Sequence, residues 1–116
     1  MVVWERDCIM RAEVKHFLTE YVNRFQVLNI EIDSLVLFGS QARGTATISS
    51  DIDIAVVTDN NFHTRSRGIL MSLGEEIDTR FAVNLFFTTK NALENASDHF
   101  DTNKHIREEG LVLWQS

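Results

Sequence analysis

The chain has 116 residues and a mass of 13.3 kDa, a length that fits one compact domain over residues 1–116. Apolar residues make up 44% of the chain and charged residues 24%, which excludes bulk disorder. With 11 basic and 17 acidic residues the net charge is −6, which argues against non-specific nucleic-acid binding and against docking on an anionic membrane. A domain of this size buries only about two thirds of its unfolded surface, so we expect a protein partner or a homo-oligomer.

The sequence carries no sign of export or of a disulfide framework. Cys8 is the only cysteine, which rules out an intramolecular disulfide and a multi-cysteine zinc site. The first residues become charged too early for a secretory signal, and no apolar run approaches the ~20 residues of a membrane span. We therefore expect a cytoplasmic protein without membrane contact.

The first half of the chain predicts one long helix followed by two strands. Apolar residues recur at steps of three and four over residues 5–28, which is typical of an amphipathic helix, and Asn29 is a suitable end for it. The apolar run over residues 34–38 stops at a glycine and predicts a buried strand. Residues 51–57 are apolar and β-branched apart from two aspartates, and they predict the second strand.

The second half alternates helical and extended patterns. Residues 64–79 show helical spacing, and residues 81–87 predict a third strand. Two short helices over residues 90–96 and 102–109 precede a last short strand over residues 111–114. This alternation predicts an α/β (α+β) fold, with a small mixed sheet of three to four strands flanked by helices.

Two acidic residues stand at the start of the second predicted strand. Asp51 and Asp53 are two residues apart, so on a strand they point the same way, roughly 6.6 Å apart along it, while Ile52 and Ile54 project from the other face. Two carboxylates held close repel each other unless a cation or a proton lies between them. Mg²⁺ meets that demand because it prefers oxygen ligands and commonly links one or two carboxylates to substrate phosphates.

A glycine–serine pair ends the first predicted strand. If Gly39 ends the strand and Ser40 opens a short helical turn through Arg43, free backbone N–H groups point toward one place. Glycine also lets an anion approach the backbone closely. Together with the aspartates, this turn predicts a binding site for a nucleoside triphosphate with magnesium.

Each feature also has a simpler interpretation. Gly39 and Ser40 alone form an ordinary turn at a strand end, and Asp51 and Asp53 alone can cap a strand and face water. Arg43 is equally well explained as an exposed structural arginine. The functional interpretation depends on the two features occurring together at this spacing.

Two segments carry a resemblance to a known family. The segments LFGSQARG (residues 37–44) and SDIDIAV (residues 50–56) resemble the signature of the polymerase-beta-like nucleotidyltransferase superfamily, which is glycine–serine, a ten-residue gap and aspartate-x-aspartate. The segment IREEGL (residues 106–111) resembles the common end of such domains, and the chain length is similar to the minimal nucleotidyltransferase branch. The resemblance implies that Gly39 and Ser40 contact nucleotide phosphates, with Arg43 assisting, and that the aspartates at 51 and 53 hold Mg²⁺.

One residue departs from the family pattern. The resemblance implies a third carboxylate on the strand over residues 81–87, and this chain places Asn84 in that position. Asparagine keeps the shape but loses the negative charge and the basicity, and general-base assistance is worth roughly 10²–10⁴-fold in rate. A buried polar residue hydrogen-bonded to backbone is the alternative interpretation of Asn84, and Asp78 is the alternative third carboxylate if the strand register differs.

The resemblance also implies a reaction and a partner. The reaction is transfer of a nucleoside monophosphate, AMP from ATP, to a hydroxyl with release of pyrophosphate. Minimal nucleotidyltransferases of this kind accompany HEPN-domain proteins, in some cases as antitoxin and toxin, so the resemblance implies such a partner and acceptor. The alternative is a catalytically degenerate member that serves as a protein-binding antitoxin or a nucleotide-sensing module.

Overall fold

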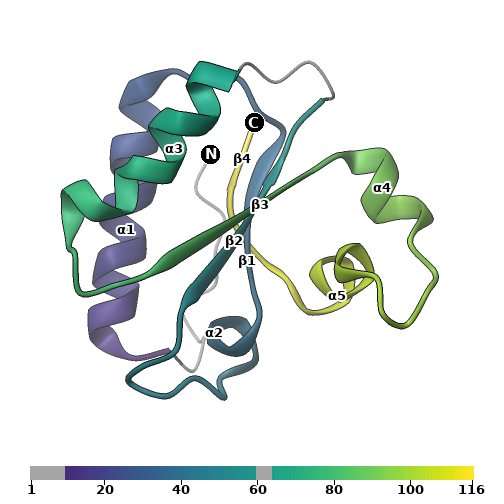
Figure 1. Ribbon diagram of the computed structural model, residues 1–116, viewed down its shortest axis with the longest axis horizontal. Helices are drawn as coiled ribbons and strands as arrows, with labels where there is room; N and C mark the ends of the chain where they lie inside the picture. Colours follow the sequence, from purple (N-terminus) through teal and green to yellow (C-terminus); the bar gives the residue numbers. More distant parts are fainter. Residues whose placement is uncertain (1–9, 60–63) are drawn as a thin grey trace.

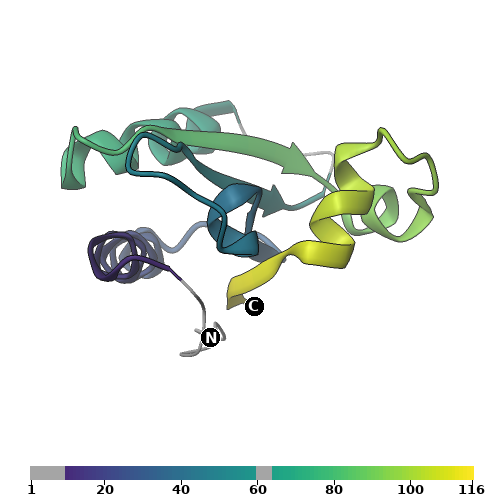
Figure 2. The same ribbon diagram turned by 90° about the horizontal axis from the view of Figure 1, so that it is seen from below.

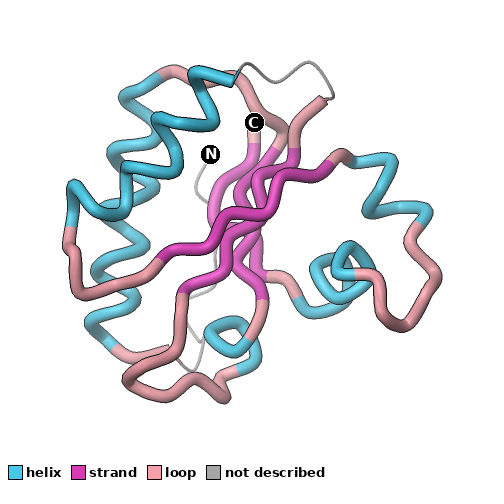
Figure 3. The backbone as a smooth tube through the Cα atoms, viewed as in Figure 1, coloured by secondary structure: helices cyan, strands magenta, loops and turns pink. Residues whose placement is uncertain are grey.

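Four strands form one mixed sheet in the order β3-β2-β1-β4. The structure is a computed structural model that describes residues 10–59 and 64–116. The central strands β1 (Ser34–Phe38) and β2 (Ile52–Val57) are antiparallel. The edge strand β3 (Val83–Thr88) runs parallel to β2, and the edge strand β4 (Leu111–Gln115) runs antiparallel to β1. The strands cross in a twisted sheet at the centre of the molecule (Figure 3).

Helices cover both faces of this sheet. Helices α1 (Ala12–Leu28) and α3 (Thr64–Ile77) lie on one side, and α4 (Lys90–Asn95) and α5 (Thr102–Glu109) lie on the other (Figures 1 and 2). The single turn α2 (Ser40–Arg43) follows β1 at the end of the sheet. The predicted mixed sheet flanked by helices is therefore confirmed.

Alternation along the strands divides the core into two parts. Ile52, Ile54 and Val56 of β2 share one face, as predicted, and they belong to the larger apolar cluster with residues of α1 and α3. Ala55 and Val57 point to the opposite face, where a smaller cluster includes Ile106 of α5. Asp53 has the same parity as Ala55, so its side chain lies on the face of α4 and α5.

Several predicted boundaries shift by a few residues. The helix predicted over 5–28 begins at Ala12, because Arg11 is already extended, and residues 5–9 lie outside the described part of the chain. It ends at Asn29, whose left-handed backbone (φ 56°) confirms the predicted stop. The strand predicted over 51–57 begins at Ile52, which donates its N–H to the Ala82 carbonyl (2.8 Å).

The turn between α3 and β3 explains two further corrections. The Asp78 carboxylate accepts the backbone N–H of Arg80 (3.0 Å), and Phe81 donates its N–H back to the Asp78 carbonyl (3.3 Å). This turn ends α3 at Ile77 rather than residue 79, and it delays β3 to Val83 rather than residue 81. The helix predicted over 90–96 ends one residue earlier, and the strand predicted over 111–114 extends one residue further.

Side chains that are distant in the sequence fix the α4–α5 layer. The Arg107 guanidinium donates to the Leu93 carbonyl (2.7 Å) at the end of α4, where helical carbonyls lack partners. Thr88, the last residue of β3, donates its hydroxyl to Asn103 of α5. Within the described ranges, no helix is long and apolar enough to cross a membrane.

Candidate functional site

The backbone at the end of β1 adopts a conformation reserved for glycine. Gly39 has φ 74° and ψ −155°, a region of backbone space that residues with a Cβ almost never occupy. A Cβ at this position would also overlap the carboxylate oxygen Oδ2 of Asp53. The antiparallel register pairs Phe38 with Asp53, so the turn after β1 closes directly on this aspartate.

The short helix α2 follows Gly39 and has free backbone donors in its first turn. It begins at Ser40, and its closing bonds run from the Arg43 N–H to the Gly39 carbonyl (3.1 Å) and from the Thr45 N–H to the Ser40 carbonyl (3.0 Å). N–H groups in a first helical turn have no acceptor inside the helix. The predicted turn over residues 40–43 is present. It begins two residues after Phe38, which pairs with Asp53 across the two central strands.

Three polar side chains meet beside this turn. The Asn84 amide nitrogen Nδ2 donates to Oδ2 of Asp51 (3.0 Å) and to Oδ1 of Asp53 (3.2 Å). The parallel register of β2 and β3 places Asn84 directly opposite Asp53. The structure therefore brings together the two aspartates and the residue expected in the third-carboxylate position.

The acid pair has a hydrogen-bond partner within the protein. The sequence predicts a cation or a proton between the two carboxylates, and the structure places the Asn84 amide against both of them. Its N–H groups are donors, which offset part of the repulsion between Asp51 and Asp53. The alternative of an Asn84 bonded to backbone is not observed, because its amide contacts carboxylates and the residue is exposed.

The side chains around the acid pair limit which ligands the site offers to a magnesium ion. Within residues 10–59 and 64–116, no group of three His, Cys, Asp or Glu side chains is placed to hold a metal ion. Asp51 and Asp53 supply two carboxylates, and Mg²⁺ is commonly bound by one or two carboxylates together with substrate phosphates and water. The residues fit a Mg²⁺ ion that arrives with a phosphate ligand, and Asn84 can add a neutral carbonyl oxygen.

Arg43 contacts a partner that the sequence did not reveal. Its Nη1 lies 3.3 Å from Oε2 of Glu109, the last residue of α5, and both side chains are partly exposed. The two residues are 66 positions apart, so no local pattern predicts this ion pair. The contact ties α2 to the α5–β4 junction, which supports a structural role for Arg43 alongside the predicted phosphate contact.

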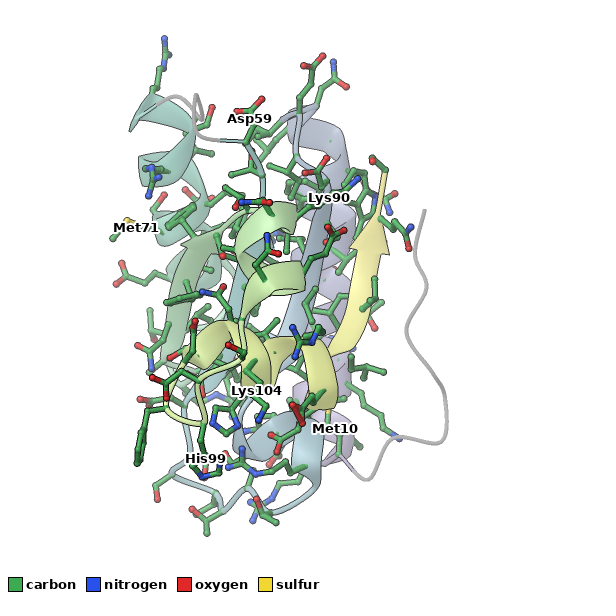
Figure 4. All side chains as sticks on the ribbon, turned by 90° about the vertical axis from the view of Figure 1, so that its right-hand side faces the viewer. Met10, Asp59, Met71, Lys90, His99 and Lys104 are labelled. Atoms are coloured by element: carbon green, nitrogen blue, oxygen red, sulfur yellow. The ribbon has the colours of Figure 1, made fainter. Side chains whose placement is uncertain are left out.

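Two cations near the α2 end of the molecule, Arg43 and Lys104, form ion pairs with consecutive glutamates. Lys104 of α5 lies toward the same end as α2, whereas Lys90 lies toward the opposite end (Figure 4). The Lys104 ammonium is 3.7 Å from Oε1 of Glu108, one turn further along the helix. Glu108 and Glu109 therefore pair with one cation each.

Asp78 lies in a different environment, which removes it as the third carboxylate. It forms a bidentate ion pair with Arg80, with Nη2 2.7 Å from Oδ2 and Nε 3.0 Å from Oδ1. Hydrogen bonds from the Arg80 side chain and backbone lower the pKa of Asp78 to about 2. Its neighbours are residues of α1, such as Glu13 and His16, on the other face of the sheet.

The loop before β2 is folded by its own hydroxyl groups. The Thr47 N–H donates to the Ser50 hydroxyl (2.8 Å), and the Ser50 N–H donates back to the Thr47 carbonyl (3.1 Å). This reciprocal turn delivers the chain to Asp51. The Ser/Thr-rich composition of residues 45–50 is the signal that identifies such a turn, although the sequence indicated only an irregular stretch.

These elements define a class of protein. Proteins of this class have a mixed sheet flanked by helices, and a glycine–serine turn that packs against a strand carrying two aspartates. The model of the polymerase beta nucleotidyltransferase family matches residues 18–114, and the chain belongs to that family. The polymerase-beta-like fold expected from the sequence is thereby confirmed.

Two solved structures are similar to the chain. One is the crystal structure of a toxin–antitoxin with AMP-PNP, which is 28% identical, has a TM-score of 0.55, and is matched over 83% of this chain and 72% of that chain. The other is a candidate nucleotidyltransferase from Sulfolobus solfataricus, which is 19% identical, has a TM-score of 0.47, and is matched over 88% of this chain and 77% of that chain. No curated protein matches the chain.

Proposed function

We propose that this protein is a magnesium-dependent nucleotidyltransferase that transfers AMP from ATP to a hydroxyl group on a partner protein. The observation that carries the proposal is the convergence of the Gly39 turn and the two aspartates. The Asp53 carboxylate packs against Gly39, and its other oxygen shares the Asn84 amide with Asp51. Family membership supports the reaction class.

The proposed roles follow from the chemistry of each group. Gly39 allows a phosphate to approach the backbone, and Ser40 offers its N–H and its hydroxyl as donors. Asp51 and Asp53 hold Mg²⁺. When bound, the ion neutralises charge on the phosphates and on the departing pyrophosphate. The bond from the α-phosphorus to the pyrophosphate oxygen breaks, and a bond from the acceptor oxygen forms.

Asn84 limits the rate in this proposal. An amide cannot accept the proton that leaves the acceptor hydroxyl, so this proton passes to solvent water without the base assistance of a third carboxylate. The protein therefore works slowly, or it works on an acceptor whose hydroxyl needs little activation.

The choice of nucleotide and partner rests on a relative. The similar structure at 28% identity is a toxin–antitoxin with AMP-PNP, an adenosine nucleotide, which favours ATP and a protein partner. The family resemblance of the sequence favours a HEPN-domain toxin as that partner. The net charge of −6 suits a basic surface on it.

A second candidate function is a degenerate member that binds its partner without chemistry. The hydrogen bonds of Asn84 favour it, because they stabilise the two aspartates without a cation. In that case the complex with the partner forms equally well when Asp51→Asn and Asp53→Asn are combined. In the enzymatic case the same pair of substitutions removes transfer.

The deciding experiment measures label transfer from α-labelled ATP to the product of the adjacent gene, with Mg²⁺ present. We expect labelled partner, and a loss of at least about 10²-fold in Asp51→Asn with Asp53→Asn. Asp78→Asn is the matched control, because that carboxylate pairs with Arg80 on the other face of the sheet. No transfer by the unmodified protein with Mg²⁺ or Mn²⁺ would contradict the enzymatic proposal, and a tight complex would then support the second candidate.

A further inference from the structure

The orientation of the Asn84 amide follows from its partners. Ionised carboxylates only accept hydrogen bonds, so the group that faces both Asp51 and Asp53 must be the NH₂ end of the amide. The carbonyl oxygen Oδ1 therefore points away from the acid pair. Asn84 lies on the edge strand β3 and is exposed, which leaves room on that side.

This orientation is incompatible with a cation on the same carboxylates. An amide NH₂ has no lone pair to offer a metal, and its hydrogens point at the oxygens that would coordinate the ion. A bound Mg²⁺ lies ~2.0–2.1 Å from its oxygen ligands, so it competes directly with the hydrogens of Nδ2. The cation and the donating amide therefore exclude each other.

A rotation of the amide resolves this conflict without any backbone movement. The two ends of an amide have nearly the same shape, and rotation about the bond to the amide carbon is a soft, two-fold torsion in asparagine. A half-turn replaces Nδ2 by Oδ1, which is a hard oxygen donor of the kind that Mg²⁺ prefers. Neither an aspartate nor an apolar residue at position 84 has two such states.

We propose that Asn84 is a two-position switch, an inference that rests on the proposed function. Without a cation its NH₂ group holds Asp51 and Asp53 together. When Mg²⁺ binds with a nucleotide, the amide turns and its carbonyl oxygen faces the ion. Each binding event then breaks two charge-assisted hydrogen bonds, so the site discriminates against Mg²⁺ alone and in favour of Mg²⁺ accompanied by phosphate oxygens.

The switch is tested by the side-chain NH₂ resonances of Asn84 in the full ¹⁵N-labelled chain. Their disappearance in Asn84→Asp, or in Asn84→Ala if the first variant does not fold, assigns them. Asn95 is an internal control, because its Nδ2 donates to Asn91 of the same helix, α4 (2.7 and 2.9 Å), and not to the acid pair. The ligands added are MgCl₂ and a non-hydrolysable ATP analogue, separately and together.

We expect the Asn84 NH₂ protons to exchange with water about tenfold faster, or more, when both ligands are present, because they lose their carboxylate acceptors. The Asn95 resonances should stay unchanged. If the backbone resonances of Ser40 and Asp53 shift while the Asn84 NH₂ protons keep their exchange rate, the switch is wrong and the proposed function stands. If no resonance near the site responds to the combined ligands, the proposed function is wrong, and the switch fails with it.

Discussion

The Asp53 carboxylate occupies the space that a side chain at residue 39 would need. Gly39 combines this close approach with a positive φ of 74°, so two independent constraints require glycine there. The same contact brings the turn before α2 to the acid pair. One glycine therefore serves both the path of the backbone and the geometry of the candidate site.

We expect Gly39→Ala to destabilise the domain by about 3 kcal/mol, from backbone strain of about 1–3 kcal/mol and from the displacement of Asp53. Gly68→Ala is the matched control. No atom lies within 4 Å of the Cβ it would add, and alanine is favoured over glycine inside α3, so this variant should gain about 0.5–1 kcal/mol. Urea unfolding of both variants measures the difference. Equal free energies of unfolding would contradict the strained geometry at residue 39.

Arg43 has two roles that substitutions can separate, namely its ion pair with Glu109 and its proposed contact with phosphate. Both side chains are partly exposed, so a double-mutant cycle of Arg43→Ala and Glu109→Gln should give a coupling energy below about 1 kcal/mol. If Arg43 also contacts phosphate, Arg43→Ala weakens binding of the ATP analogue by about tenfold, whereas Glu109→Gln leaves it equal or tighter because the guanidinium is released. Calorimetric titration distinguishes the roles. Equal losses in both variants would mean that Arg43 acts through its contact with α5 alone.

Asn84→Asp should make the stability of the domain depend on magnesium. The substitution removes the donor to Asp51 and Asp53 and adds a third negative charge, so in EDTA we expect a loss of about 1–2 kcal/mol. Mg²⁺ should restore more stability to this variant than to the original protein, and transfer of AMP should accelerate. Thermal unfolding with and without Mg²⁺ measures the effect. Asn23→Asp, which adds the same charge on α1, is the control, and an identical response of the two variants would rule out a role of position 84 in cation binding.

We expect Tyr21, the only tyrosine, to make the stability of the fold decrease at alkaline pH. Burial raises its pKa, and its hydroxyl donates to the Leu70 carbonyl (3.1 Å) across α1 and α3. Because the pKa in the folded state exceeds the ordinary value of 10.0, the stabilisation is complete below pH 10 and is lost as the pH rises further. Tyr21→Phe should cost about 1 kcal/mol at pH 7 and flatten the decline above pH 10. Urea unfolding at several alkaline pH values compares the two proteins, and parallel curves would contradict the assignment.

Much of the architecture follows from local patterns. The strand over residues 34–38 and the helix over residues 102–109 have the predicted bounds, and a glycine follows each of them. Period-two alternation also placed Asp53 on the face opposite Ile52 and Ile54. Boundaries failed where a side chain caps the backbone, as Asp78 does after α3, because propensity patterns do not encode such local hydrogen bonds.

By itself, the sequence determined the residue types of the candidate site and the order of the elements. Both depend on interactions between near neighbours in the chain, namely the glycine–serine turn and the two aspartates two residues apart. Only the tertiary structure decided which partners these residues meet. The parallel pairing of β2 with β3 brings Asn84 to the aspartates, and the packing of α5 on β1 brings Glu109 to Arg43. Hydrogen bonds and ion pairs depend on distances of about 3 Å, and only the folded chain creates such distances between residues 31 to 66 positions apart.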